Sequence, residues 1–456
     1  MTLLSEIPSV NHYSLQLRLS LNEERLEAKA CIRVMNETQK TFAEIPFILY
    51  RLLDVEVITD EQGNPLDFTQ AVVKFVDQGK LQVNAVTVQL PKPLIPGNSV
   101  EITMKYSGSI YGYPEIWQYV QDRIGEDFSL VRTDAFSYPI LAYSTMKSRH
   151  AVVYSSFTYD VQIAVPKGYI AACGGNLVDT VHQGNTIAFS YQSKVPTWRM
   201  DIAAAKYNVL KDEEDKLFVY AFPEDEAGAV DVLEAMKRAT HFYSESFGQL
   251  RRYQGLTLIE IPNGLGSQAG DGYIVQTADA FKSPGGLRGV YHEIAHAWNV
   301  KAEPEVQRCR WFDEAFAQYF TALALRELED EKAFEDLMSH YGDAFARAVQ
   351  QDRQNYETPI AEYGRNELGD NSYTKGPWVL YVLHQIVGEQ HFYRIIKTFL
   401  SEFSDGQADF GDFQKVAEQI TGKDLDLFFN EWIFGIESSQ YLLDKALIQQ
   451  IARKYQ

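Results

Sequence analysis

The segment YHEIAH, residues 291–296, places two imidazoles and a carboxylate within a few residues of one another. His292 and His296 are four residues apart, so on an α-helix they lie one turn apart on the same face. Two imidazoles at this spacing can bind one zinc ion. Glu293 projects beside them, where it can exchange a proton with water at the metal. The spacing therefore predicts a metal site with an acid/base next to it.

A catalytic zinc site needs a third protein ligand and an open fourth position. The candidate is Glu314, in the segment WFDEAFAQYF, which has helical spacing. Imidazole and carboxylate ligands together suit zinc, so we expect one zinc ion bound by His292, His296 and Glu314. The neighbouring Asp313 could orient a metal ligand, but its place near the helix start favours a helix N-cap.

The helix that must carry the two histidines is predicted by the spacing of its apolar residues. The sequence SPGG at 283–286 suits a helix start, and the residues after it form one apolar stripe: Leu287, Val290, Tyr291, Ile294, Ala295 and Trp298. From Leu287 onward the pattern is mostly helical. A glycine-rich loop at 262–272 precedes this region and follows a short strand-like run at 256–261.

The first part of the chain alternates apolar and polar residues, as strands with one buried face do. Such runs lie at 13–21, 28–34 and 159–165, and a Pro96-Gly97 turn between 86–90 and 100–106 predicts a hairpin. We therefore expect an α+β protein: an N-terminal β-sandwich-like domain over residues 1–208, followed by a mostly helical catalytic domain over residues 209–456.

The charge balance limits the partners. The net charge is −20, which argues against binding nucleic acid or an anionic membrane and is compatible with a cationic peptide amino terminus. No run of about 18 apolar residues predicts a membrane span. Three widely spaced cysteines, Cys31, Cys173 and Cys309, predict no disulfide framework, and with an amino terminus unlike a signal peptide they favour the cytoplasm.

The two motif segments, HEIAHAWNVK and WFDEAFAQYF, together resemble the gluzincin metallopeptidases, most closely the membrane alanyl aminopeptidase (aminopeptidase N) family. That family has HExxH, usually eighteen residues, and then Glu; here the interval is seventeen residues. The WNVK stretch looks more like the related glycyl aminopeptidase family. The stretches at 156–161 and 421–433 are similar to a strand of the family's β domain and to the end of its catalytic domain. The resemblance covers nearly the whole chain, without the family's large C-terminal helical domain, and implies a thermolysin-like catalytic domain.

The segment YTKG at 373–376 is similar to the family's YxKG motif. In that family the tyrosine supports the transition state. The resemblance therefore implies that Tyr373 donates a hydrogen bond to the developing oxyanion, while Glu293 is the catalytic acid/base.

The family's GxMEN motif, whose Glu binds the substrate's free amine, is changed here. The matching stretch is GSQAGDG at 266–272, with Ala269 in the place of that Glu and Gly270 in the place of Asn. Gly266, Gln268 and Asp271 are the candidate substrate-binding residues, and Asp271 or Gln268 could replace the missing amine anchor.

The predicted activity is zinc-dependent hydrolysis of peptide bonds, with an aminopeptidase on short peptides as the leading hypothesis. Loss of the amine anchor would also suit an endopeptidase or another zinc hydrolase that admits blocked substrates. A binding protein that keeps the fold without turnover is a third possibility. The retained Glu293 argues against it, because a site without turnover does not need that acid.

Overall fold

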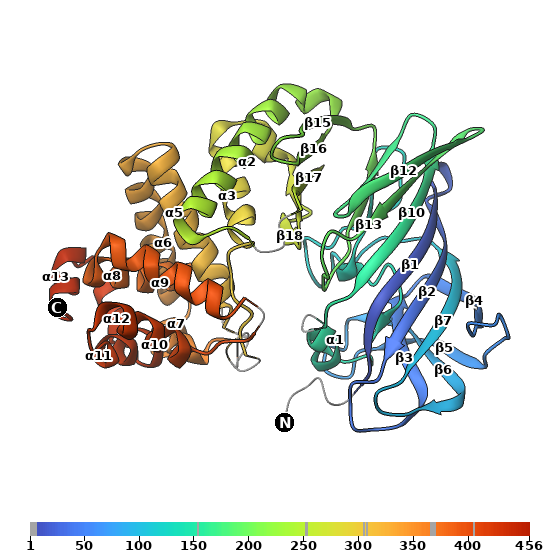
Figure 1. The fold of residues 1–456 in the computed structure, drawn as a ribbon, viewed down its shortest axis with the longest axis horizontal. Helices are drawn as coiled ribbons and strands as arrows, with labels where there is room; N and C mark the ends of the chain where they lie inside the picture. Colours follow the sequence, from blue (N-terminus) through green and yellow to red (C-terminus); the bar gives the residue numbers. More distant parts are fainter. Residues whose placement is uncertain are drawn as a thin grey trace. The chain divides into compact units, whose positions relative to one another are not determined.

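The computed structural model describes residues 7–152, 155–250, 254–303, 306, 309–364, 371–404 and 406–456. The chain folds into two compact units: a β-rich unit, Met1–Leu233 with Gln254–Ser283, and a helical unit, Glu234–Tyr253 with Pro284–Gln456 (Figure 1). A β-rich first part followed by a mostly helical second part is the predicted fold class, which is confirmed. Among the described residues, no helix is long and apolar enough to cross a membrane.

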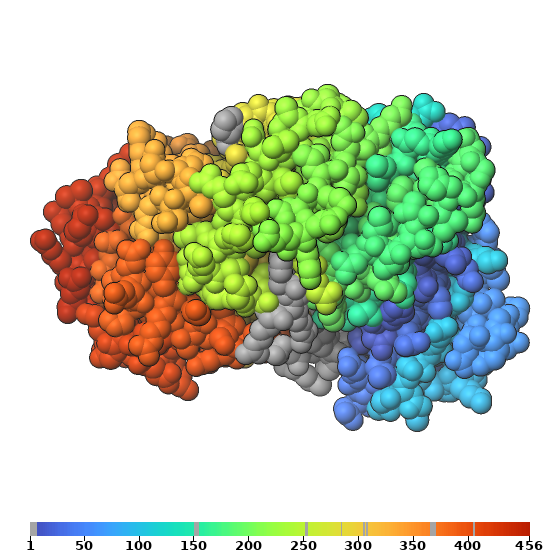
Figure 2. Space-filling model, turned by 45° about the horizontal axis from the view of Figure 1, so that its top comes forward, coloured from blue at the N-terminus to red at the C-terminus, as the bar shows by residue number. Residues whose placement is uncertain are grey.

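The largest sheet of the β-rich unit has seven strands in the order β12-β13-β10-β1-β2-β7-β4. β1 buries alternate residues, among them Tyr13, Leu15 and Leu17, as its sequence pattern predicts. It pairs antiparallel with β2 and parallel with β10, so distant parts of the chain lie side by side (Figures 1 and 2). The strands are β1 Ser9–Ser20, β2 Arg25–Met35, β4 Leu53–Thr59, β7 Ser99–Gly108, β10 Thr158–Pro166, β12 Asn176–Gln183 and β13 Thr186–Gln192.

A four-stranded sheet, β5-β6-β3-β9, contributes to the same hydrophobic core. The predicted hairpin around Pro96-Gly97 is wrong, because β6 pairs with β3 and β5 while β7 pairs with β2 and β4. The turn instead carries the chain from one sheet to the other. Alternation shows that a strand has a buried face, but not which strand it pairs with. The strands are β3 Phe42–Tyr50, β5 Phe68–Lys74, β6 Gln82–Leu94 and β9 Ile140–Leu141.

Two smaller sheets complete this unit, in the orders β11-β14-β8 and β15-β16-β17-β19-β18. β17 is buried along its whole length and parallel to both neighbours, as expected of a strand that is apolar on both faces. The predicted 208/209 division falls at the first strand of the five-stranded sheet, whereas the compact β-rich unit includes that sheet; the division stays a prediction. The strands are β8 Ser129–Val131, β11 Ile170–Cys173, β14 Ile202–Ala205, β15 Asn208–Asp212, β16 Leu217–Ala221, β17 Leu256–Ile261, β18 Gln268–Gly270 and β19 Tyr273–Thr277.

The helical unit is built around α5, which packs against α3, α6 and α8. Its interior is rich in aromatic rings, with Phe316 and Phe413 buried and in edge-on contact at 5.6 Å between ring centroids. The α-helices of the chain are α1 Met146–Val152, α2 Glu226–Phe247, α3 Leu287–Ala295, α5 Phe316–Leu328, α6 Glu331–Gln351, α7 Gln354–Glu357, α8 Gly376–Val387, α9 Glu389–Glu402, α10 Phe410–Thr421, α11 Asp426–Phe429, α12 Glu437–Leu443 and α13 Ile448–Arg453.

Candidate metal centre

The two histidines come from α3 and from the residue that follows it. His296 is the C-cap of α3 and keeps helical dihedral angles, φ −57° and ψ −21°, so it remains one turn from His292. The helix ends earlier than the apolar stripe predicts. Trp298 lies beyond its end, where the indole Nε1 donates to the carbonyl of Gly248 at 2.8 Å. The one-turn spacing that metal binding needs is nevertheless preserved.

Glu314 lies in a π-helical turn, η7 (Trp311–Ala315), which leads directly into α5. π-Helical turns are uncommon and frequent at functional sites, because they change the direction in which side chains project. Trp311 is fully buried and packs edge-on against Phe413 at 5.4 Å, which fixes the turn on the aromatic core. Since α5 packs on α3, this turn presents Glu314 to the histidines.

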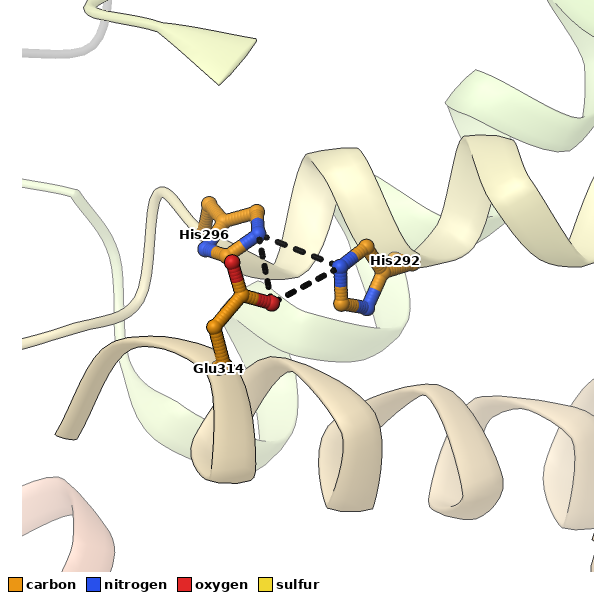
Figure 3. Close-up of side chains that lie close together, drawn as sticks. All are labelled: His292, His296 and Glu314. Carbon is orange, nitrogen blue, oxygen red and sulfur yellow. Dashed lines mark hydrogen bonds and ion pairs between the residues drawn. The ribbon is translucent and has the colours of Figure 1, made fainter. Parts of the chain in front are cut away.

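The ligand atoms of His292, His296 and Glu314 all lie within 4.8 Å of one another. The two Nε2 atoms are 3.2 Å apart, and Glu314 Oε2 lies 3.4 Å from His292 Nε2 and 3.8 Å from His296 Nε2 (Figure 3). The imidazole rings are nearly perpendicular, at 82°. The structure thus brings the three predicted ligand atoms together around a common point.

The electrostatics of this point suit a cation. Glu314 is 3% exposed, and within the described part of the chain its Oε2 forms no hydrogen bond. A buried carboxylate oxygen in this condition is costly unless a cation compensates it. Two imidazole nitrogens and one carboxylate oxygen form a three-ligand set that zinc accepts while keeping one coordination position open. The residues present therefore fit one zinc ion.

Asp313 contacts the far side of the His296 ring. Its Oδ1 lies 2.7 Å from His296 Nδ1. Burial lowers the pKa of His296, but the carboxylates of Asp313 and Glu314 outweigh burial and raise it to about 9. The N-cap role favoured from the sequence is wrong, because Arg310 occupies the cap position and Asp313 lies inside η7. A carboxylate on the other ring nitrogen fixes the tautomer that offers Nε2 to a metal.

Glu293 is buried, with 9% of its surface exposed. Burial raises its pKa, and the nearby histidines His292 and His296 partly oppose that rise. A raised pKa makes the carboxylate a stronger base, which suits the removal of a proton from water. These properties agree with the predicted acid/base role, which stays a prediction.

Tyr373 lies in the turn that precedes α8. Gly376 is the first residue of α8, and a Cβ there would lie 2.5 Å from the Ala315 Cβ, so the glycine lets the start of this helix pack against the segment that carries Glu314. Lys375 is fully buried, and its Nζ donates to Ser439 Oγ at 3.1 Å. The YTKG sequence thus brings Tyr373 next to the metal-site segment for a packing reason that is local to this unit.

Arg310 is a further residue at this site, and it was not among the residues predicted from the sequence. Its Nη1 donates to the Tyr373 hydroxyl at 2.9 Å, and its Nη2 donates to Asp313 Oδ2 at 3.1 Å and to Glu314 Oε1. The signal available in the sequence was its spacing, because Arg310 precedes Glu314 by four residues, the interval of a helical ion pair. The contact to Tyr373 is 63 residues away along the chain and had no sequence signal.

The candidate substrate-binding residues lie in the β-rich unit. Gly266 has a positive φ of 72°, and β18 begins at Gln268. The side-chain carbonyl of Gln268 accepts from Arg199 Nη2 at 2.6 Å and from Arg132 Nη1 at 3.4 Å. An oxygen facing two guanidinium groups is a poor acceptor for an ammonium group, so Asp271, which is exposed, is the better candidate of the two. Both assignments stay predictions.

The departure from the GxMEN pattern has a structural reason at Gly270. A Cβ at this position would overlap the ring of Tyr273, whose hydroxyl donates to the buried Asp201 at 2.8 Å. Asparagine would require that tyrosine to move. The changed motif is therefore built into the packing of the β18–β19 hairpin.

The comparison with protein families agrees with this geometry. Residues 287–432 match the model described as the peptidase family M1 domain. This segment contains all three candidate metal ligands, together with Glu293 and Tyr373. Residues 287–432 are thus similar to an M1 peptidase domain, and the predicted resemblance to the aminopeptidase N family is confirmed.

Curated relatives are aminopeptidases of greater length. The chain is 28% identical over 155 residues to leucyl aminopeptidase of Saccharolobus solfataricus, covering 32% of this chain and 19% of that protein. It is 26% identical over 207 residues to human endoplasmic reticulum aminopeptidase 2, covering 41% and 21%. It is 20% identical over 300 residues to probable aminopeptidase 1 of Sulfurisphaera tokodaii, covering 60% and 37%. The chain thus spans well under half the length of these relatives.

Solved structures share the fold over nearly the whole chain. An M1 zinc metallopeptidase mutant from Deinococcus radiodurans, bound to a Tyr-Ser-Ala substrate, aligns with a TM-score of 0.68 at 16% identity and covers 95% of this chain and 97% of that one. The unmutated enzyme aligns with a TM-score of 0.66, also at 16% identity, and covers 97% and 96%. The arrangement of a β-rich part and a helical part therefore occurs in a family of zinc metallopeptidases.

Proposed function

We propose that this chain is a zinc-dependent aminopeptidase that binds one zinc ion through His292, His296 and Glu314. The substrates are short peptides with a free amino terminus. The convergence of three ligand atoms on one point, with an uncompensated buried carboxylate oxygen, is the observation that carries the proposal. The aminopeptidase names of the relatives support the choice of substrate end.

The chain's own residues divide the chemistry among them. A zinc ion at this site would supply a Lewis acid that makes water more acidic and polarises the scissile carbonyl. Glu293 removes a proton from the attacking water and then delivers it to the leaving amine. Tyr373 donates a hydrogen bond from its hydroxyl to the oxygen on which negative charge develops. Asp313 holds His296 in the tautomer that leaves Nε2 available for the metal.

The test compares an aminoacyl fluorophore that has a free amine with its acetylated twin, each measured with zinc and after chelation. Cleavage restricted to the free amine and abolished by chelation supports the proposal. Cleavage that survives chelation contradicts it. The matched pair of variants is Glu293→Gln and Glu335→Gln, the second at an exposed position of α6.

A second candidate is an endopeptidase or another zinc hydrolase acting on blocked substrates. It is favoured by Ala269 in place of the amine-binding Glu and by the two arginines that occupy the Gln268 carbonyl. Cleavage of an internally quenched, acetylated peptide would establish it. An Asp271→Asn variant whose KM rises only for the free-amine substrate would instead support the aminopeptidase and assign the amine anchor.

We also propose that the chain binds peptides, does not bind nucleic acid, and is located in the cytoplasm. An acidic chain of this kind is expected to bind peptides and not nucleic acid. Cys31, Cys173 and Cys309 form no disulfide, which suits the reducing cytoplasm proposed for this chain.

A further inference from the structure

Arg310 connects the two halves of the proposed catalytic apparatus within the helical unit. One edge of its guanidinium contacts the carboxylates of Asp313 and Glu314, and the other contacts the hydroxyl of Tyr373. The guanidinium carbon also lies 5.6 Å from the centroid of the Tyr373 ring. We infer that Arg310 is a positioning residue, which holds Glu314 as a ligand through one oxygen and sets the hydroxyl of Tyr373 for transition-state stabilisation. This inference rests on the proposed function.

The two oxygens of Glu314 have different partners. Oε1 accepts from Arg310, whereas Oε2 faces the Nε2 atoms of His292 and His296. A carboxylate that binds zinc through both oxygens uses space that an open coordination position needs. Because the guanidinium engages Oε1, it favours binding through Oε2 alone. Arg310 thereby keeps room at the metal for water or substrate.

The hydroxyl of Tyr373 is the second group that Arg310 contacts. The Tyr373 oxygen accepts a hydrogen bond from Arg310 Nη1, so its own proton can be given to a different acceptor. A cation beside the oxygen strengthens that O–H group as a donor. A planar guanidinium can hold a carboxylate and a phenol at once, whereas a lysine ammonium is a single point charge on a flexible stem. The identity of the residue therefore matters, as well as its charge.

The backbone supports a positional role. Arg310 has φ 53° and ψ 25°, in the left-handed region, and it forms the cap of the π-helical turn η7 that carries Glu314. This conformation is unfavourable for a residue with a side chain, and it is commonly retained where surrounding contacts require it. Glycine adopts it freely, so Arg310→Gly removes the side chain without adding backbone strain.

The experiment uses Arg310→Gln, Arg310→Lys and Arg310→Gly, with Arg353→Gln as the matched control. Arg353 also pairs with a glutamate four residues away, Glu357, and also lies over a tyrosine ring, but both partners are outside the proposed site. Zinc affinity is measured by competition with a chromophoric chelator, and the cobalt-substituted proteins are compared by their visible absorption spectra. Thermal unfolding identifies any variant that fails to fold.

We expect Arg310→Gln and Arg310→Gly to weaken zinc binding by about 10–100-fold and to change the cobalt spectrum, as loss of a group that orients a ligand does. Arg310→Lys should recover much of the affinity but not kcat. Arg353→Gln should match the wild type. Unchanged affinity and spectra in both Arg310→Gln and Arg310→Gly would overturn the link to Glu314, whether or not the protein is a peptidase.

The link to Tyr373 is tested separately by a double-mutant cycle. Arg310→Gln should lower kcat by about tenfold in the wild type and much less in Tyr373→Phe, because the two residues act together. An equal loss of kcat in both backgrounds would overturn this link. A wild type that binds zinc but cleaves no peptide would contradict the proposed function while leaving the affinity result on Arg310 valid.

Discussion

Each unit buries a cluster of charged side chains, and the two clusters differ in whether every carboxylate oxygen has a hydrogen-bond donor. In the β-rich unit, Arg132 pairs with Asp122 at 2.9 Å, and Arg199 pairs with Asp201 at 2.8 Å and with Asp134 at 2.9 Å. These side chains are all buried, and each carboxylate faces a guanidinium at hydrogen-bond distance. The cluster is complete without a ligand.

The cluster in the helical unit is not complete in this way. Glu293, Asp313 and Glu314 lie around two imidazoles and the guanidinium of Arg310, and within the described residues Glu314 Oε2 forms no hydrogen bond. A buried carboxylate oxygen without a donor is destabilising unless a cation lies beside it. The comparison teaches that buried charge alone does not mark a functional site; the informative feature is a ligand atom that the protein leaves without a hydrogen bond.

The largest expected effect is on turnover and concerns the helical cluster alone. Glu293→Gln should lower kcat by about 10³–10⁴-fold, because the amide cannot accept the proton from water. Zinc content should stay at the wild-type value, since Glu293 is not a proposed ligand. Steady-state kinetics and metal analysis measure both quantities. A variant that keeps wild-type kcat would contradict the mechanism, and Glu335→Gln serves as the control.

The next prediction concerns the buried arginine–aspartate cluster of the β-rich unit. Asp201→Ala leaves Arg199 buried without its main partner and should lower the free energy of unfolding by about 3–5 kcal/mol. Urea denaturation measures the loss. Glu213→Ala, which removes one partner of the exposed Lys211–Glu213 pair, should leave the midpoint unchanged. Equal behaviour of the two variants would show that the buried cluster does not stabilise the fold.

A third prediction concerns the binding of zinc to the charged cluster of the helical unit. Zinc present at about 100 times its Kd should raise the free energy of unfolding by about 2.7 kcal/mol, and chelation should reverse the gain. His292→Ala should lose this response, whereas His340→Ala, at an exposed position of α6, should keep it. Thermal unfolding with and without zinc provides the measurement. A zinc response that persists in His292→Ala would place the ion elsewhere.

The last effect, which is the smallest over a single pH unit, concerns a buried histidine outside both clusters. Burial and the charge of Arg326 lower the pKa of His384 to about 3, and its Nδ1 lies 2.8 Å from the Tyr319 hydroxyl. Between pH 3 and about 6.5 the unfolded chain therefore binds more protons than the native one. Stability from this group is fully present above about pH 6.5 and is lost as the pH falls toward 3, by at most about 1.4 kcal/mol per pH unit.

Denaturation curves over this pH range test the prediction. In His384→Gln the dependence of stability on pH should flatten by the contribution of one proton. The exposed His340→Gln should keep the wild-type slope. A slope that His384→Gln leaves unaltered would contradict the low native pKa of His384.

Sequence spacing predicted the parts of the site that lie on single helices. His292 and His296 are brought together by one helical turn, and the apolar stripe around them predicted α3 to within a few residues. Glu314 could be proposed as the third metal ligand because its segment has helical spacing and lies close in sequence to the two histidines. The strands themselves were predicted equally well, because alternating apolar and polar residues indicate a strand with one buried face.

Contacts between distant segments could not be predicted in this way. The failed hairpin at Pro96-Gly97, the link from Arg310 to Tyr373 and the capture of Gln268 by Arg199 all depend on which elements meet in three dimensions. The role of Asp313 was misjudged for a local reason. The π-helical turn begins after Arg310, so the residue expected at the cap lies inside the turn and reaches His296 instead.

The most direct test of the central claim is a zinc titration of the metal-free protein, with turnover of the free-amine substrate followed at each addition. The account predicts no activity at the start, a linear rise, and a break at one zinc per chain, with no rise in Glu314→Gln at the same concentrations. Activity that is independent of zinc, or a break at two ions per chain, would contradict it.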